Sequence, residues 1–113
     1  MGIMFGFATH RRQQLDAELR RMAEELPRLG VGRAYLSGDL ADGTVDVESE
    51  LEIVLVHETA EVFHRRPDFF TTHLRPRVAT HFIVYTRHEF EALQDDDPVL
   101  EAVIRAGTGI DRS

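Results

Sequence analysis

The chain has 113 residues, of which 13 are basic and 20 acidic, so its formal net charge is −7. This excess of acid argues against direct nucleic-acid binding, which depends on surplus Lys and Arg. Cysteine is absent, which excludes disulfides, thiolate metal sites and cysteine nucleophiles. The length fits one domain over residues 1–113, and no apolar run approaches the ~20 residues that span a bilayer. The apolar first residues lack a basic leader, so we expect no signal peptide, no membrane association and a cytoplasmic protein.

The first half of the chain predicts a helix followed by a short strand. Apolar residues recur at helical spacing over about His10–Leu26, and the proline that follows ends the helix. Gly30 and Gly32 predict a turn, and residues 33–37 a short strand that contains an aromatic residue. Residues 38–49 contain two glycines and four acids without periodicity, which predicts a loop with at most one turn of helix.

The most apolar segment, Leu51–Val56, predicts a central strand that is buried on most of both faces. We expect helical segments over His57–Arg66 and Asp68–Leu74, with Pro67 ending or kinking the first of them. Residues 77–86 predict a further strand.

Two helices are predicted near the end of the chain. Thr86 and Glu89 have the spacing of a capping box, which begins the first helix. Asp97 before Pro98 predicts the start of a last short helix, which closes at Gly107. The order helix, strand, strand, helix, strand, helix, helix indicates an α/β or α+β domain whose small sheet is covered by helices.

Two carboxylates share one face of the predicted central strand. Side chains alternate along a strand, so Glu50 and Glu52 point the same way, with Cα atoms about 6.5–7 Å apart. Both can reach one metal ion, or two ions about 3.5–4 Å apart. An acid within so apolar a strand is costly unless it is paired. The alternative is an edge strand with one solvated face.

The segment around this strand has a regular order of small and acidic residues. An apolar strand is followed by Gly38, Gly43 and Ser49, and then by Glu50 and Glu52. This order and spacing resemble the signature of the DNA-polymerase-β-like nucleotidyltransferases in their minimal form: an apolar strand, a Gly-Ser turn, a helix with a Gly, and a Ser-Asp-hydrophobic-Asp strand. The resemblance covers about residues 15–110. It places His81 where the family's next strand has its third metal-site carboxylate.

The resemblance implies a nucleotidyltransferase fold with a small mixed β-sheet, helices packed mainly on one face, and an acidic cleft at the start of the central strand. It also implies Mg²⁺-dependent transfer of a nucleotidyl group, AMP, from ATP to a hydroxyl acceptor. The residues implied for this chemistry are Glu50, Glu52 and His81 as catalytic and metal-binding groups, and Gly38, Asp39 and Ser49 at the nucleotide.

The chain departs from the family pattern at these same positions. Asp39 puts a carboxylate where the family has a serine beside the triphosphate, and like charges a few Å apart repel by about 4 kcal/mol at an effective dielectric near 20. Glu50 and Glu52 are one methylene longer than aspartate, whereas Mg²⁺ demands octahedral geometry at about 2.0–2.1 Å. His81 suits Zn²⁺ or Ni²⁺ better than Mg²⁺.

Two functions therefore stay open. The first is an active transferase that uses ATP or another nucleotide. The second is a pseudoenzyme that keeps the fold and binds a partner, as minimal nucleotidyltransferase antitoxins pair with small helical toxins. A homodimer or a partner protein would supply the acceptor site that so short a chain lacks. His81 either joins Glu50 and Glu52 in a mixed metal site or is hydrogen-bonded to one of them without metal.

A basic stretch with interleaved phenylalanines lies in the middle of the chain. It contains Arg65, Arg66, Arg75 and Arg77. Such a stretch can hold a phosphate, an RNA end or an acidic partner. We favour the simpler interpretation, in which the phenylalanines belong to the core and the arginines are solvated.

Overall fold

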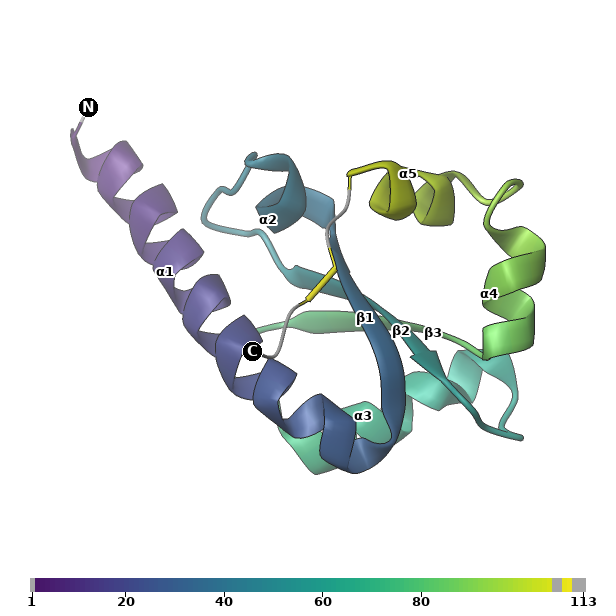
Figure 1. The fold of residues 1–113 in the computed structure, drawn as a ribbon. Helices are drawn as coiled ribbons and strands as arrows, with labels where there is room; N and C mark the ends of the chain where they lie inside the picture. Colours follow the sequence, from purple (N-terminus) through teal and green to yellow (C-terminus); the bar gives the residue numbers. More distant parts are fainter. Residues whose placement is uncertain (1, 107–108, 111–113) are drawn as a thin grey trace.

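The computed structural model of the protein describes residues 2–106 and 109–110. Within them, five helices surround a three-stranded sheet of order β1-β2-β3 (Figure 1). The central strand β2 (Leu51–His57) pairs antiparallel with β1 (Val31–Ser37) and parallel with β3 (Thr80–Tyr85). The α/β class, the mixed sheet and the central place of the most apolar strand are thus confirmed.

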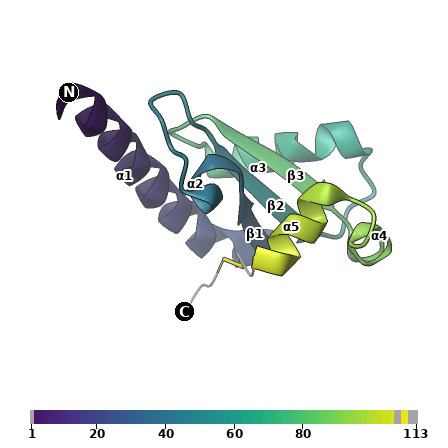
Figure 2. The same ribbon diagram turned by 90° about the horizontal axis from the view of Figure 1, so that it is seen from above.

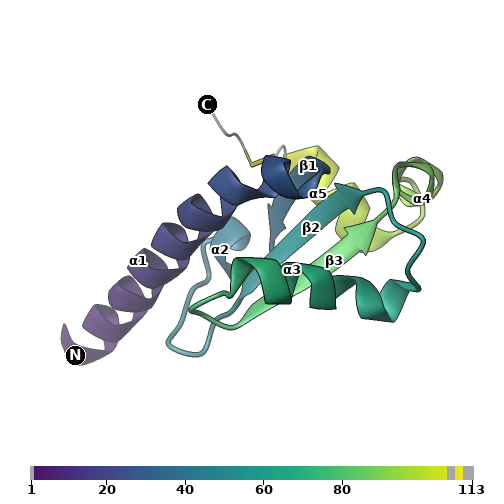
Figure 3. The ribbon, with the colours of Figure 1, turned by 90° about the horizontal axis from the view of Figure 1, so that it is seen from below.

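One face of the sheet carries the larger core. It is covered by α1 (Gly2–Glu25) and α3 (Arg66–Leu74), and α2 (Gly38–Asp42) contributes at the end of β1 (Figures 1 and 3). Alternate β2 side chains point to this face, because successive residues of a strand face opposite ways. The principal members of this core are Leu15, Met22, Leu26, Leu40, Leu51, Ile53, Leu55, Phe70, Leu74, Phe82 and Val84.

The opposite face carries a second, smaller core beneath α4 (Arg87–Leu93) and α5 (Pro98–Ala106). Seen from above, α3 and α5 lie on opposite sides of the sheet (Figure 2). Three of the five helices belong to the larger core, so helices do lie mainly on one face, but the other face is also covered. The buried members of the smaller core are Val54, Val56, Tyr85, Phe90, Leu100 and Val103.

The first helix is longer than the sequence pattern indicates. It begins at Gly2 rather than near His10, and its first half extends beyond the sheet (Figure 1). Phe7 in this half is 54% exposed, whereas Leu15 is fully buried. A helix that is nucleated by a packed segment extends at little further cost, so the turns before Leu15 need no apolar stripe of their own. In residues 2–106, none of the helices combines the length and the apolar character needed to cross a membrane.

The helix expected over His57–Arg66 is wrong. His57 is the last residue of β2, residues 58–62 are not helical, and only Phe63–Arg65 forms a short 3-10 helix, η2. Pro67 does not end a helix but lies in the first turn of α3. A proline fits there because its missing N–H would have no partner inside the helix.

The third strand is also shorter than expected, since it covers Thr80–Tyr85 rather than residues 77–86. Arg75 ends α3 in the left-handed region with φ 47°. The backbone N–H of Arg77 donates to the Glu18 carboxylate of α1. This segment is therefore anchored to a helix before the chain enters the sheet.

The predicted helix caps are present. The Thr86 hydroxyl accepts from the Glu89 N–H, and the Glu89 carboxylate accepts from the Thr86 N–H, as the capping box requires. The Asp97 carboxylate accepts from the second residue of α5 at 2.9 Å. Of the two glycines expected to turn, Gly30 does so and Gly32 lies within β1 at a register shift. Gly107 lies outside the described residues.

Candidate functional site

Several motif residues meet where β1 ends and where β2 and β3 begin. Ser37, the last residue of β1, lies opposite Glu52 of β2. Glu52 in turn lies in register with His81 of β3. Residues in register on adjacent strands point to the same face, and adjacent strands are about 4.8 Å apart. The fold therefore brings Glu52 and His81 together, as the sequence predicts.

The Glu52 carboxylate is held by a serine that the sequence analysis did not select. The Ser37 hydroxyl, which is buried, donates to Glu52 Oε2 at 2.6 Å. This bond explains how an acid can be tolerated in an apolar strand, because a buried charge needs a hydrogen-bond partner. The signal in the sequence was a hydroxyl at the end of a predicted strand, directly before a motif glycine.

Gly38 lies against the same glutamate. Its φ is 76°, in the left-handed region that favours glycine. A Cβ atom at this position would lie 3.2 Å from Glu52 Cβ, closer than a comfortable contact. A larger residue would be strained and would push the glutamate, so the turn and the position of Glu52 depend on each other.

Asp39, in the first turn of α2, and Ser49, in the loop between α2 and β2, are hydrogen-bonded to each other. The Ser49 hydroxyl donates to Asp39 Oδ2 at 2.7 Å, and the Thr44 hydroxyl lies 3.2 Å from Asp39 Oδ1. Ser49 is buried and also accepts from the Asp46 N–H at 2.9 Å. Of the three residues expected at the nucleotide, Asp39 and Ser49 thus join the start of α2 to the loop before β2, and Gly38 forms the turn against Glu52.

Glu50 and His81 are exposed, whereas Glu52 is half-buried. Glu50 precedes β2, so the strand geometry that aligns Glu52 with His81 does not extend to it. Within residues 2–106 and 109–110, no group of three or more His, Asp or Glu side chains is arranged to hold a metal ion. A metal site at Glu50, Glu52 and His81 would require the two exposed side chains to turn toward Glu52, and it stays a prediction.

A cavity of about 330 Å³ opens beside Glu52. One side is formed by Ser37, Gly38, Asp42 and Glu52, and the other by α5 residues between Pro98 and Val103. Among the described residues that line it, the charged side chains are the two carboxylates of Asp42 and Glu52. Asp39, Ser49, Glu50 and His81 are not part of this lining. The cavity is therefore acidic on one side and largely apolar on the other.

Some charged residues outside this cavity serve the fold. Arg66 is 8% exposed and donates to both Glu89 oxygens, at 2.6 and 3.1 Å, and to the backbone oxygen of Val84 at 3.0 Å. The hydrogen bond from Arg66 holds the pKa of Glu89 at about 2, well below its usual range. For Arg66 the expectation of a solvated arginine is thus wrong, because the guanidinium joins α3 to β3 and α4.

Glu18 and Arg21 of α1 play the same part at the other end of α3. Arg21 donates to Glu18 at 2.7 Å and to the Leu74 backbone oxygen at 2.8 Å. The hydrogen bond from Arg21 lowers the pKa of Glu18, which is buried. Neither residue of this pair lines the cavity beside Glu52.

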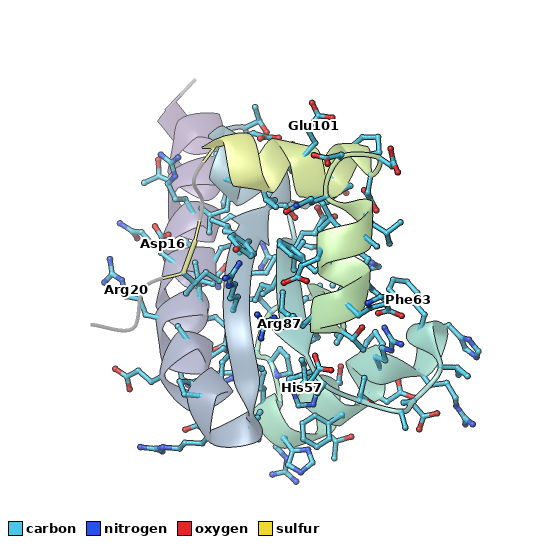
Figure 4. All side chains as sticks on the ribbon, turned by 45° about the vertical axis from the view of Figure 1, so that its right-hand side comes forward. Asp16, Arg20, His57, Phe63, Arg87 and Glu101 are labelled. Atoms are coloured by element: carbon cyan, nitrogen blue, oxygen red, sulfur yellow. The ribbon has the colours of Figure 1, made fainter. Side chains whose placement is uncertain are left out.

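His57 is distant from the candidate site. His57 is the last residue of β2 and lies beside α3. The cavity of the candidate site is lined by α5, on which Glu101 is labelled at the other end of the molecule (Figure 4). The His57 ring stacks on Phe69 at 5.5 Å and contacts Phe70 edge-on at 5.1 Å. These contacts give it a place in the packing between β2 and α3.

Comparison of the chain with protein-family models, with curated protein sequences and with solved structures gives no match. The resemblance to the minimal nucleotidyltransferases therefore depends on the motif spacing in the sequence, since a small α/β fold does not identify that family.

Proposed function

We propose that this chain is a catalytically degenerate nucleotidyltransferase-like domain that acts by binding a partner protein. The observation that carries the proposal is that the Asp39 carboxylate is held in place by hydrogen bonds. By the motif alignment Asp39 replaces the serine of the family, and its carboxylate is held by hydrogen bonds from Ser49 and Thr44. A nucleoside triphosphate would meet a held negative charge, which repels it.

The lining of the cavity supports the same proposal. A triphosphate is normally bound by backbone N–H groups together with basic side chains or metal ions. The charged groups described around this cavity are carboxylates. Val99, which lines it from α5, is 37% exposed, so an apolar part of the rim faces outward where a partner can pack against it.

An active transferase is the competing function, and two observations favour it. Glu52 and His81 lie in register on one face of the sheet, and Gly38 packs against Glu52 as a compact phosphate-binding turn would. Mg²⁺, or Zn²⁺ or Ni²⁺ with His81 as a ligand, would complete that site if Glu50 turned toward it.

Calorimetric titration with ATP and Mg²⁺ separates the two functions. We expect no measurable binding and no transfer of labelled AMP to any acceptor in a cell extract. A sub-millimolar affinity that disappears in Glu52→Ala but persists in the loop variant Thr44→Ala would overturn the proposal in favour of the transferase. The same titration with Zn²⁺, Ni²⁺ and Mg²⁺ alone tests the mixed site, since His81→Ala should abolish a Zn²⁺ or Ni²⁺ preference.

The molar mass of the purified chain in solution tests whether its partner is a second copy of itself. Light scattering of the purified chain distinguishes a monomer from a homodimer, in which the partner is a second copy. A monomer is the form expected to associate with a different protein, such as a small helical one.

A further inference from the structure

We infer that the cavity between α2, the start of β2 and α5 binds a cation on a short aliphatic stem, of which an arginine side chain is the best fit. The inference rests on the proposed function, because it names the chemistry that a partner would bring to that site. It takes its support from the charge, the shape and the hydrogen bonding of the cavity.

The charges around the cavity favour a cationic ligand. Glu52 and Asp42 line the cavity, and none of the described lining residues is basic. The chain as a whole has a net charge of −7, so its long-range field also attracts cations. An anionic ligand would enter against both the local and the overall charge.

The hydrogen bonding of Glu52 decides where the cation binds. Ser37 donates to Oε2 and fixes the carboxylate, while none of the side chains between residues 6 and 103 donates to Oε1. A carboxylate that is held in place by one donor and remains available to a second is pre-organised for a charge-assisted bond. A planar guanidinium suits it because it offers several N–H donors in a fixed arrangement.

The α5 side of the cavity favours a ligand whose cation is carried on an aliphatic stem. Pro98, Val99, Ala102 and Val103 of α5 present apolar surface to the cavity. Long cationic side chains pack their methylene groups along such surface while the charged end reaches a polar group. A volume of about 330 Å³ lies at the lower end of the range for small-ligand sites, which suits one side chain.

The test uses two probes with the full-length chain: N-acetyl-arginine methylamide, which mimics an arginine within a protein, and butylguanidinium, a free cation with the same end group. We expect binding with a dissociation constant of about 1 mM or tighter, followed through amide shifts of Ser37, Gly38 and Ala102 in NMR spectra. Binding of both probes supports the site for free and protein-borne cations. Binding of the blocked arginine alone supports a protein-borne source.

Two variants locate the site. Glu52→Gln should weaken binding at least about tenfold, because it removes a charge-assisted hydrogen bond. Glu50→Gln is the matched control: it removes the same charge two residues away, outside the cavity lining, and should change binding by no more than about twofold. Ala102→Phe, which narrows the cavity from α5 without altering its charge, should also weaken binding.

Failure of both probes to bind, or equal weakening by Glu52→Gln and Glu50→Gln, would overturn the inference. These results would leave the proposed function standing, because that proposal fails on nucleotide binding and AMP transfer instead.

Discussion

The hydrogen bond between Ser37 and Glu52 is the contact on which the candidate site depends. Ser37 is buried and Glu52 half-buried, so loss of the hydroxyl deprives Oε2 of its hydrogen-bond donor. We expect Ser37→Ala to lower the free energy of unfolding by about 1–2 kcal/mol, measured by urea denaturation. Thr44→Ala removes an exposed hydroxyl that also bonds a carboxylate, and should cost no more than about 0.5 kcal/mol.

The comparison of these two variants is informative because both delete a hydroxyl that donates to an acid. Equal costs would show that the Ser37 bond is no stronger than a surface contact, and Glu52 would then need another explanation within the apolar strand. The sequence alone predicts that Glu52 needs a partner. It does not identify the partner, because Ser37 reaches Glu52 only through the pairing of β1 with β2.

At the scale of elements, the Arg66–Glu89 pair links α3 to the start of α4. The pKa of Glu89 is about 2 in the folded protein, against an ordinary value of 4.5, because Arg66 donates to its carboxylate. The unfolded chain therefore takes up a proton near pH 4.5 that the folded chain resists until about pH 2. Stability from this pair is present above pH 4.5 and should be lost progressively as the pH falls toward 2.

Glu89→Gln tests this through urea denaturation at several pH values. The variant should be less stable at neutral pH, and its stability should fall less steeply between pH 4.5 and 2, although Glu18 still contributes a slope of the same sign. Glu91→Gln is the matched control, because Glu91 pairs with Arg87 on the surface and should leave the slope unchanged. If the free energy of unfolding of Glu89→Gln fell with pH as steeply as that of the wild type, the Arg66–Glu89 pair would not be the source of the pH dependence.

Elements whose signal is local are those that the sequence predicts well. Leu51–Val56 is identified by apolar β-branched composition, and the cap of α4 by the spacing of two residues. The segment after β2 cannot be predicted in this way, because Pro67 can either end one helix or begin the next. Packing around Phe70 and the hydrogen bonds of Arg66 favour the second arrangement. The segment before the start of β3 is likewise anchored by a contact of Arg77 with Glu18 of a distant helix.

The candidate site shows the same division at the scale of the molecule. Strand alternation and motif spacing predict that Glu52 and His81 belong together, and the sheet register does place them side by side. The α5 wall of the cavity is beyond such reasoning, since it depends on how the last helix crosses the sheet. Asp39 is predicted to oppose a nucleotide, whereas its hydrogen bonds to loop hydroxyls emerge only from the folded loop.

The sheet separates two cores, and whether they unfold together is a property of the whole molecule. Leu15 lies in the larger core and Leu100 in the smaller, and both are fully buried. Because β2 contributes side chains to both cores, we expect a single cooperative transition. Leu15→Ala and Leu100→Ala should each lower the free energy of unfolding of the protein by about 2–5 kcal/mol, measured by urea denaturation with two spectroscopic probes.

The outcome that would contradict this expectation is separate unfolding of the smaller core. If Leu100→Ala left the main transition unchanged and exposed only the amides of α4 and α5 to hydrogen exchange, the smaller core would be an independent unit. The α5 wall of the cavity could then open without global unfolding.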